Sequence, residues 1–283
     1  MRIPIGIIVC WICCSIHAQQ YHGTLLYTWN NNNSMNIYLP QDYFSSEEYY
    51  PVLYLLHGVS DNELCWLKEV NVRLMFDELI SKGEMREMII VMPSVSGLVN
   101  GSYESSFDTI MSYVESNFRI YKNKEFHAIA GISLGGFYAM HISHRCYNHF
   151  DYVGLFSAIY TTDKKSIFKK EREALFGINQ TSPIIYKNTE KELEKLFQCN
   201  PKLYFISIGK HDFLYNQNVL FRNYLTEHKY PFVYHETGGG HDWKNWQSYL
   251  MIFLPLLFND LPDTINTQYK DLEDDKALED III

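Results

Sequence analysis

Short apolar runs alternate with longer segments of helical spacing along most of the chain. The runs are continuous and of strand length, as is typical of strands buried on both faces of a sheet, and they lie at 51–56, 88–92, 126–130, 152–159 and 202–208. Between them, apolar positions recur every three or four residues at 67–81, 107–118, 134–145 and 216–228. This alternation predicts an α/β fold, with a mostly parallel sheet and helices on both faces.

The two ends of this pattern differ from its middle. Residues 21–28 and 35–39 predict two strands joined by an Asn-rich turn, so we expect an antiparallel start to the sheet. The last expected strand, 231–235, precedes an apolar helix over 243–258 that we expect to be interrupted near Pro255. The segment 161–200 is polar and rich in lysine, which predicts a small cap-like insertion over the edge of the sheet rather than a linker.

The first residues have the composition of a targeting segment. After Arg2 they are almost wholly apolar up to Ile16, and Ser15-Ile-His-Ala18 resembles a cleavage region. This predicts a signal peptide over 1–18, too short for a membrane span, and hence a secreted or periplasmic protein without an integral membrane span. A lipid anchor at Cys13 or Cys14 is the alternative. The folded domain is then expected over 19–259, followed by an acidic tail over 260–283.

Charge and cysteine usage exclude several classes of function. The 283 residues carry a net charge of −9, much of it in the tail, and a basic face of the kind that nucleic acids require is not evident.

Cys65, Cys146 and Cys199 follow the signal segment; an odd number leaves either one bridge and a free thiol or three buried thiols. His141 and His144 share a helical face, but no carboxylate joins them, so we do not expect a metal site. The oligomeric state stays open.

A Gly-x-Ser-x-Gly motif, Gly131-Ile-Ser133-Leu134-Gly135, lies between an expected strand and an expected helix. A serine on such a sharp turn has strained backbone angles, and close neighbours favour glycine on either side. The turn exposes the Ser133 oxygen at the carboxyl edge of the sheet, beside the free N–H groups of a helix start. We therefore expect Ser133 to be a nucleophile; a serine that merely caps the helix is the alternative.

A serine nucleophile requires a base and a carboxylate that orients this base. The last strand leads into Gly238-Gly-Gly-His241, where three glycines allow an imidazole to swing over the sheet edge, so His241 is the expected general base. Asp212 follows the preceding strand, and Ser…Asp…His is the triad order of α/β-hydrolases. The alternatives are a surface histidine at 241 and a helix-capping role for Asp212; Asp242 is a weaker candidate for the acid.

The remaining expected site residues lie around the same edge. The backbone N–H groups of Leu134 and of Val59, which follows His57-Gly58, are the expected oxyanion donors. We expect substrate contacts from His57, Trp66, Trp243 and Trp246, and core packing is the alternative for the tryptophans.

Taken together, these motifs resemble the esterase D-type family of α/β-hydrolases, above all its bacterial tributyrin and acetyl-xylan esterases, which are relatives of feruloyl esterases. The resemblance covers roughly residues 24–258 and rests on Pro51-Val-Leu-Tyr-Leu-Leu-His-Gly58 with Asp61-Asn62, Trp66 and Asn71-Val72, then Gly131-Ile-Ser-Leu-Gly-Gly136, Asp212-Phe-Leu-Tyr-Asn216, and Gly240-His-Asp-Trp243 with Trp246. By this resemblance, Ser133, Asp212 and His241 form the triad, and Val59 and Leu134 supply the oxyanion N–H groups. Ser60 stands where the family often has glycine.

The resulting hypothesis is a secreted serine carboxylesterase that uses no cofactor and forms an acyl-enzyme. Its expected partner is a small-molecule or polysaccharide ester with a short acyl group, and the carbohydrate part of this expectation rests on the family resemblance and on export. An acyltransferase with the same triad and a non-catalytic carbohydrate-binding relative are the alternatives.

Overall fold

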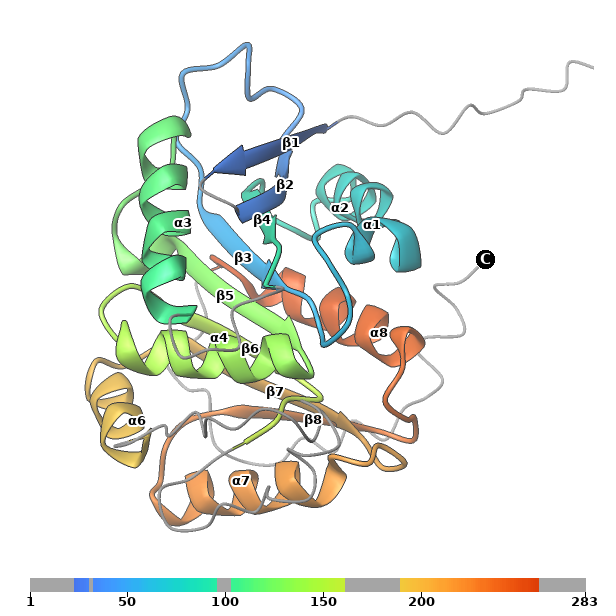
Figure 1. Ribbon diagram of the computed structural model, residues 1–283, viewed down its shortest axis with the longest axis vertical. Helices are drawn as coiled ribbons and strands as arrows, with labels where there is room; N and C mark the ends of the chain where they lie inside the picture. The colour runs from blue at the N-terminus through green and yellow to red at the C-terminus, as the bar shows by residue number, and fades with distance from the viewer. Residues whose placement is uncertain (1–22, 31–32, 96–102, 161–188, 260–283) are drawn as a thin grey trace, which may run out of the picture.

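The computed structural model describes residues 23–30, 33–95, 103–160 and 189–259. The expected signal peptide, most of the expected cap and the expected acidic tail lie outside the described residues. Within them, one eight-stranded sheet has the order β1-β2-β4-β3-β5-β6-β7-β8 (Figure 1). Its strands are β1 Thr24–Asn30, β2 Asn33–Leu39, β3 Val52–Leu56, β4 Ile89–Pro93, β5 His127–Ile132, β6 Tyr152–Phe156, β7 Leu203–Gly209 and β8 Val233–Thr237.

Strand direction divides the sheet into two parts. β1 pairs antiparallel with β2, and β2 pairs antiparallel with β4, which confirms the antiparallel start. From β4 through β3, β5, β6 and β7 to β8, every pair is parallel. Parallel strands end at the same edge, so the loops after β3, β5, β7 and β8 all open at the carboxyl edge of the sheet.

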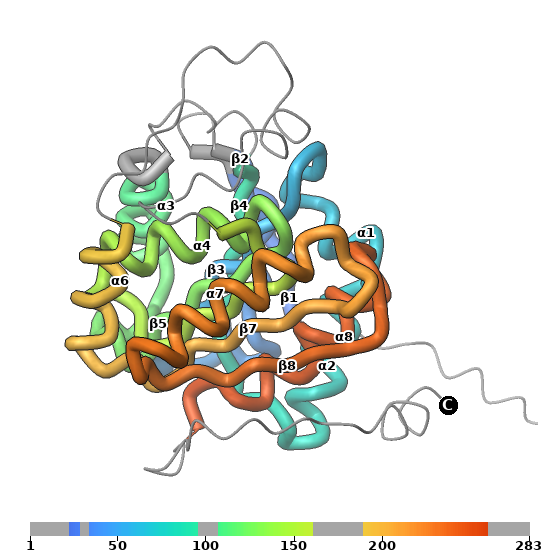
Figure 2. The backbone as a smooth tube through the Cα atoms, turned by 90° about the horizontal axis from the view of Figure 1, so that it is seen from below, coloured from blue at the N-terminus to red at the C-terminus, as the bar shows by residue number. Residues whose placement is uncertain are grey.

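Helices cover both faces of the sheet, as the α/β pattern predicts. They are α1 Cys65–Val70, α2 Val72–Ser81, α3 Tyr103–Asn117, α4 Leu134–Arg145, α6 Thr189–Gln198, α7 Tyr215–Glu227 and α8 Trp243–Phe253, with short 3₁₀ turns at η1 Lys124–Phe126 and η2 Leu254–Leu256. α3, α4, α6 and α7 contribute to one apolar cluster, and α1, α2 and α8 contribute to another. Figure 2 shows α3 and α4 on one side of the strands and α2 and α8 on the other.

Successive side chains along a strand point to opposite faces of the sheet, so they belong alternately to these two clusters. In β3, Val52 and Tyr54 belong to the cluster under α3 and α4, whereas Leu53 and Leu55 belong to the cluster under α1, α2 and α8. All five β3 residues are buried, so a continuous apolar run is what both faces require. Because helices pack against both faces of each such strand, the strand ends are held in place. The loops of the carboxyl edge, which begin at these ends, are positioned in turn.

Two helical segments differ from a simple periodic pattern. The expected helix over 67–81 is two helices, because Asn71 has a left-handed φ of 44° and its N–H closes α1 on the carbonyl of Trp66. The expected interruption near Pro255 is confirmed: α8 ends at Phe253, and a 3₁₀ turn with Pro255 follows.

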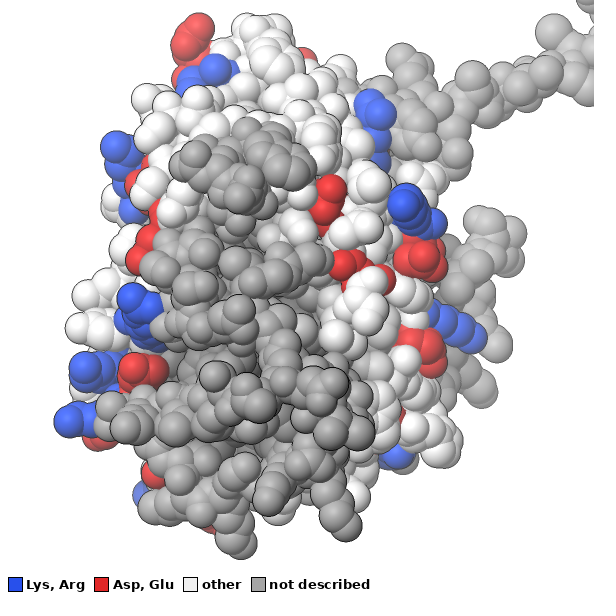
Figure 3. All heavy atoms as spheres, in the orientation of Figure 1, with Lys and Arg blue, Asp and Glu red and all other residues white. Residues whose placement is uncertain are grey.

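Within the described part of the chain, no helix has the length and apolar character needed to cross a bilayer. On the face shown in Figure 3, Lys and Arg side chains lie among Asp and Glu side chains. Cys65 and Cys199 carry free thiols, and Cys65 is buried.

Candidate active site

Ser133 occupies the sharp turn between β5 and α4. Its backbone is strained, with φ 52° and ψ −114°, a region that a residue with a side chain rarely adopts. The turn is tied to the neighbouring strand, because the N–H of Ser133 donates to the carbonyl of Phe156 over 2.9 Å. A Cβ on Gly135 would lie 2.7 Å from the carbonyl oxygen of Leu56, and one on Gly131 would lie 2.8 Å from the nitrogen of Gly136. Both glycines are therefore required by close backbone contact rather than by a positive φ.

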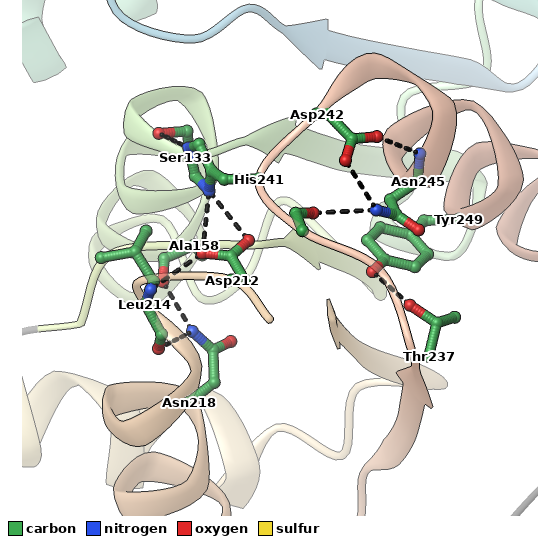
Figure 4. Close-up of polar contacts among 11 residues, drawn as sticks. Ser133, Ala158, Asp212, Leu214, Asn218, Thr237, His241, Asp242, Asn245 and Tyr249 are labelled. Atoms are coloured by element: carbon green, nitrogen blue, oxygen red, sulfur yellow. Dashed lines mark hydrogen bonds and ion pairs between the residues drawn. The ribbon is translucent and has the colours of Figure 1, made fainter. Parts of the chain in front are cut away.

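His241 bridges Ser133 and Asp212 at this edge (Figure 4). Its Nε2 lies 3.0 Å from the Ser133 Oγ, and its Nδ1 lies 2.8 and 3.0 Å from the two Asp212 carboxylate oxygens. The Asp212 side chain is fully buried and that of His241 is 16% exposed. Since the carboxylate accepts the Nδ1 proton, Nε2 is left to accept the proton of the serine hydroxyl. The structure thus brings together three side chains that the sequence places more than 100 residues apart at the extremes.

The Asp212 loop is braced by two further groups. One Asp212 oxygen also accepts the N–H of Leu214, over 2.8 Å, directly before α7. The side-chain amide of the fully buried Asn218 donates to the carbonyls of Ala158, after β6, and of Leu214. These bonds join the carboxyl ends of β6 and β7, so the position of the carboxylate is set by the sheet. Sequence reasoning did not single out Asn218, which carries no motif.

The loop that carries His241 is held from α8. Asp242 is the N-cap of this helix: one carboxylate oxygen accepts the N–H of Asn245 over 3.1 Å. The Asn245 side-chain amide in turn donates to the Gly240 carbonyl over 2.9 Å and to the other Asp242 oxygen over 3.1 Å. Asp242 therefore organises the start of α8 rather than the base, and Asn245, which sequence reasoning missed, fixes the residue before His241.

The expected oxyanion donors lie on two adjacent loops. β3 and β5 are paired with Leu56 opposite Gly131, so the loop that contains Val59 lies next to the turn that contains Leu134. Leu134 is the first residue of α4, where backbone N–H groups have no intrahelical acceptor. Val59 is partly exposed at the same edge.

His57 has a structural role that differs from the expected substrate contact. Its ring is buried, its Nδ1 donates to the Gly58 carbonyl over 2.8 Å, and its Nε2 accepts the N–H of Val95 over 2.8 Å. Burial lowers the pKa of His57, which keeps the ring neutral for both bonds. Both nitrogens are occupied by main-chain partners, so His57 ties the Val59 loop to the end of β4 instead of facing substrate.

The three expected tryptophans form one edge-to-face chain. The ring of Trp66 contacts that of Trp243 at 5.2 Å, and Trp243 contacts Trp246 at 5.1 Å. Trp66 is fully buried in the cluster under α1, α2 and α8, which is the core packing that the sequence offered as the alternative. Trp246 is also buried and stands perpendicular to the His241 ring at 5.0 Å, whereas Trp243 is partly exposed.

His141 and His144 lie buried on α4, behind the serine. Burial lowers the pKa of both, that of His144 to about 3, and the Nε2 of His144 lies 3.0 Å from the Tyr204 hydroxyl of β7. Among the described residues, no group of three or more His, Cys, Asp or Glu side chains is placed to hold a metal ion. Burial in an apolar interior therefore accounts for the lowered pKa values of His141 and His144.

Known proteins share this fold and these motifs. A family model described as "Putative esterase" matches residues 28–257. An endo-1,4-beta-xylanase/feruloyl esterase of Xylanibacter ruminicola is 33% identical over 139 residues, which are 43% of this chain and 19% of that protein. An acetyl esterase of Caldicellulosiruptor saccharolyticus is 27% identical over 218 residues, 70% of this chain and 79% of that protein.

A solved structure of a ferulic acid esterase is similar to this chain, with a TM-score of 0.71 and 26% identity, over 84% of this chain and 98% of that one. The chain spans between about a fifth and about half of the length of several curated relatives that it matches. The family match covers most of the sheet and every loop of its carboxyl edge, from β3 to α8. The chain belongs to the esterase family, with an α/β-hydrolase fold.

Proposed function

We propose that this protein is a secreted or periplasmic serine carboxylesterase that hydrolyses short acyl esters of carbohydrates. The observation that carries the proposal is the position of His241, within hydrogen-bond distance of both Ser133 and Asp212. The printed names of the relatives, a xylanase/feruloyl esterase and an acetyl esterase, support an ester linked to a polysaccharide. The apolar segment over 1–18 supports export.

In the proposed first half-reaction, the Ser133 Oγ bonds to the ester carbonyl carbon while its proton passes to the Nε2 of His241. The carbonyl oxygen becomes an oxyanion, which accepts hydrogen bonds from the N–H groups of Val59 and Leu134. The Asp212 carboxylate stabilises the imidazolium and holds its Nδ1 proton. As the tetrahedral species collapses, the bond between the carbonyl carbon and the alcohol oxygen breaks, and the alcohol leaves with the proton from Nε2.

In the second half-reaction, water takes the place of the alcohol. His241 removes its proton, the water oxygen bonds to the acyl carbon, and the Ser133 oxygen departs with that proton. The acid is released and the resting state is restored. Every step uses side chains and backbone groups of this chain, and none requires a cofactor.

The test is hydrolysis of p-nitrophenyl acetate, butyrate and octanoate by the wild type, Ser133→Ala and Ser81→Ala. Ser81 is the control, because its hydroxyl is exposed at the end of α2 and bonds only locally, to the Glu78 carbonyl. We expect activity that falls with acyl length, is unchanged in Ser81→Ala and drops by a factor of at least about 10³ in Ser133→Ala. Equal activity in wild type and Ser133→Ala, or none in either, contradicts the proposal. An added sugar alcohol that captures most of the acyl group as a new ester contradicts hydrolysis as the main reaction.

A further inference from the structure

Phe213 is a large apolar residue that remains exposed beside the proposed base. It directly follows Asp212, and its side chain is 59% exposed. Its ring centroid lies 4.4 Å from that of the His241 imidazole, with an angle of 50° between the two planes. The imidazole therefore contacts one buried ring, Trp246, and one exposed ring, Phe213. A single exposed apolar side chain elsewhere needs no explanation, but one that touches the base lies where substrate must bind.

The reaction tells which part of the substrate lies there. The Nε2 of His241 gives its proton to the departing alcohol oxygen, so the alcohol portion of the ester must lie beside the imidazole. The acyl portion extends from the same carbonyl carbon, whose oxygen is directed at the N–H groups of Val59 and Leu134. A ring in van der Waals contact with the imidazole is therefore positioned to touch the alcohol portion.

We propose that Phe213 is the specificity-determining residue for the alcohol portion, and that it selects a sugar by stacking on the C–H face of the sugar ring. The inference rests on the proposed function and names the half of the substrate that this side chain recognises. An exposed aromatic face offers a large apolar area with few rotatable bonds, which suits a flat ring better than a short alkyl chain.

The substrates of the test share the acetyl group and differ in the alcohol: ethyl acetate, benzyl acetate and a mono-O-acetylated methyl β-xyloside. Each variant is compared with the wild type on the same ester, so differences in the basicity of the leaving oxygen cancel. The variants are Phe213→Ala, the conservative Phe213→Tyr, and Leu220→Ala as a matched control, because Leu220 is a similarly exposed apolar residue, at 53%, that lies within α7.

We expect Phe213→Ala to lower kcat/KM for the benzyl and xyloside esters by about 3- to 10-fold, the effect of losing one aromatic contact, and to leave ethyl acetate within about twofold. Phe213→Tyr retains the ring, so its kcat/KM for the benzyl and xyloside esters is expected to equal that of the wild type. Leu220→Ala is expected to match the wild type on all three esters. The parameter kcat/KM reports acylation, the step in which the alcohol is still bound.

Deacylation separates recognition of the alcohol from an effect on the base. Once the alcohol has left, Phe213 has no part of the substrate to recognise, whereas His241 still acts on water. We therefore expect the deacylation rate after a burst with p-nitrophenyl acetate to be the same in wild type and Phe213→Ala. An equal loss for all three esters, together with slower deacylation, shows that Phe213 acts through His241 and overturns the proposal.

Two other outcomes also overturn it. A loss for benzyl acetate without a loss for the xyloside refutes selection of a sugar, and equal rates for all esters in wild type and Phe213→Ala refute any recognition by the ring. A wild type that hydrolyses none of the esters refutes the proposed function itself. That failure is seen before any Phe213 variant is measured, so the two failures are distinguishable.

Discussion

A buried histidine on α4, the helix that follows Ser133, predicts how the fold responds to acid. His144 lies fully buried on α4, and burial lowers its pKa to about 3, against 6.5 in an exposed chain. Between these values the unfolded chain binds a proton that the folded chain does not, so stability rises with pH and falls as pH drops below 6.5. The titratable neighbours are His141 on the same helix, at 6.3 Å between ring centroids, and Tyr204 of β7.

The size of the effect follows from the unfolded chain alone, because the folded chain does not protonate His144 until near pH 3. Each pH unit below 6.5 costs about 1.4 kcal/mol, so the loss between about pH 7.5 and about pH 5 is about 2 kcal/mol. Burial also lowers the pKa values of His57, His127, His141 and His235, which act in the same direction and steepen the wild-type response.

The assay is urea unfolding at both pH values for the wild type and His144→Gln. Glutamine places a polar atom near the position of Nε2, within reach of Tyr204, and does not bind a proton. We expect His144→Gln to lose about 2 kcal/mol less than the wild type between the two pH values. His228→Gln is the control, because His228 is exposed at the end of α7 and its replacement is expected to leave the wild-type response intact. Equal pH dependence in wild type and His144→Gln refutes the reasoning.

Two further substitutions test the backbone around the site. Gly135→Ala is expected to destabilise the protein by about 3 kcal/mol or more in urea unfolding, because the new Cβ overlaps the His57 carbonyl oxygen; a change below about 1 kcal/mol contradicts that packing. Asn245→Ala removes the bond to the Gly240 carbonyl and is expected to lower kcat about 10-fold with little change in KM. Asn117→Ala, which removes a similar bond on α3, is expected to have no kinetic effect, and equal kcat values for the two variants contradict a positioning role.

The arrangement of the carboxyl edge was predictable because its signals are local. Each parallel strand ends in a short run with its own chemistry, and the parallel direction alone brings the loops of Ser133, Asp212 and His241 to one edge. The strand boundaries moved by about two residues: the expected strand 231–235 is Val233–Thr237. Such shifts do not affect the site, because the functional side chains lie in the loops after the strands.

Features set by distant packing were not predictable. The break at Asn71 leaves the apolar periodicity of 67–81 intact, so the pattern did not reveal it. Trp66 and His57 look like site residues in sequence because they neighbour the oxyanion loop. α8 packs over the same sheet face and buries Trp66. The N–H of Val95 donates to the Nε2 of His57. Asn218 and Asn245 belong to no signature. Phe213 lies within the Asp212-Phe-Leu-Tyr-Asn216 motif, but the motif does not reveal that its ring contacts His241. The contacts of all three residues depend on which helices meet at the edge.

The proposed base, His241, follows β8, which lies at the edge of the sheet, and this order has a consequence for how the chain would acquire the proposed activity. β8 is an edge strand with mostly half-buried residues, and the Ser133–His241 contact closes a loop of 108 residues. Pairings so distant in sequence form late, and during synthesis the nucleophile turn emerges well before its base exists. On the proposed function, an emerging or truncated chain therefore carries an inert Ser133. Regain of hydrolysis during refolding would then report the docking of β8 rather than the collapse that precedes it.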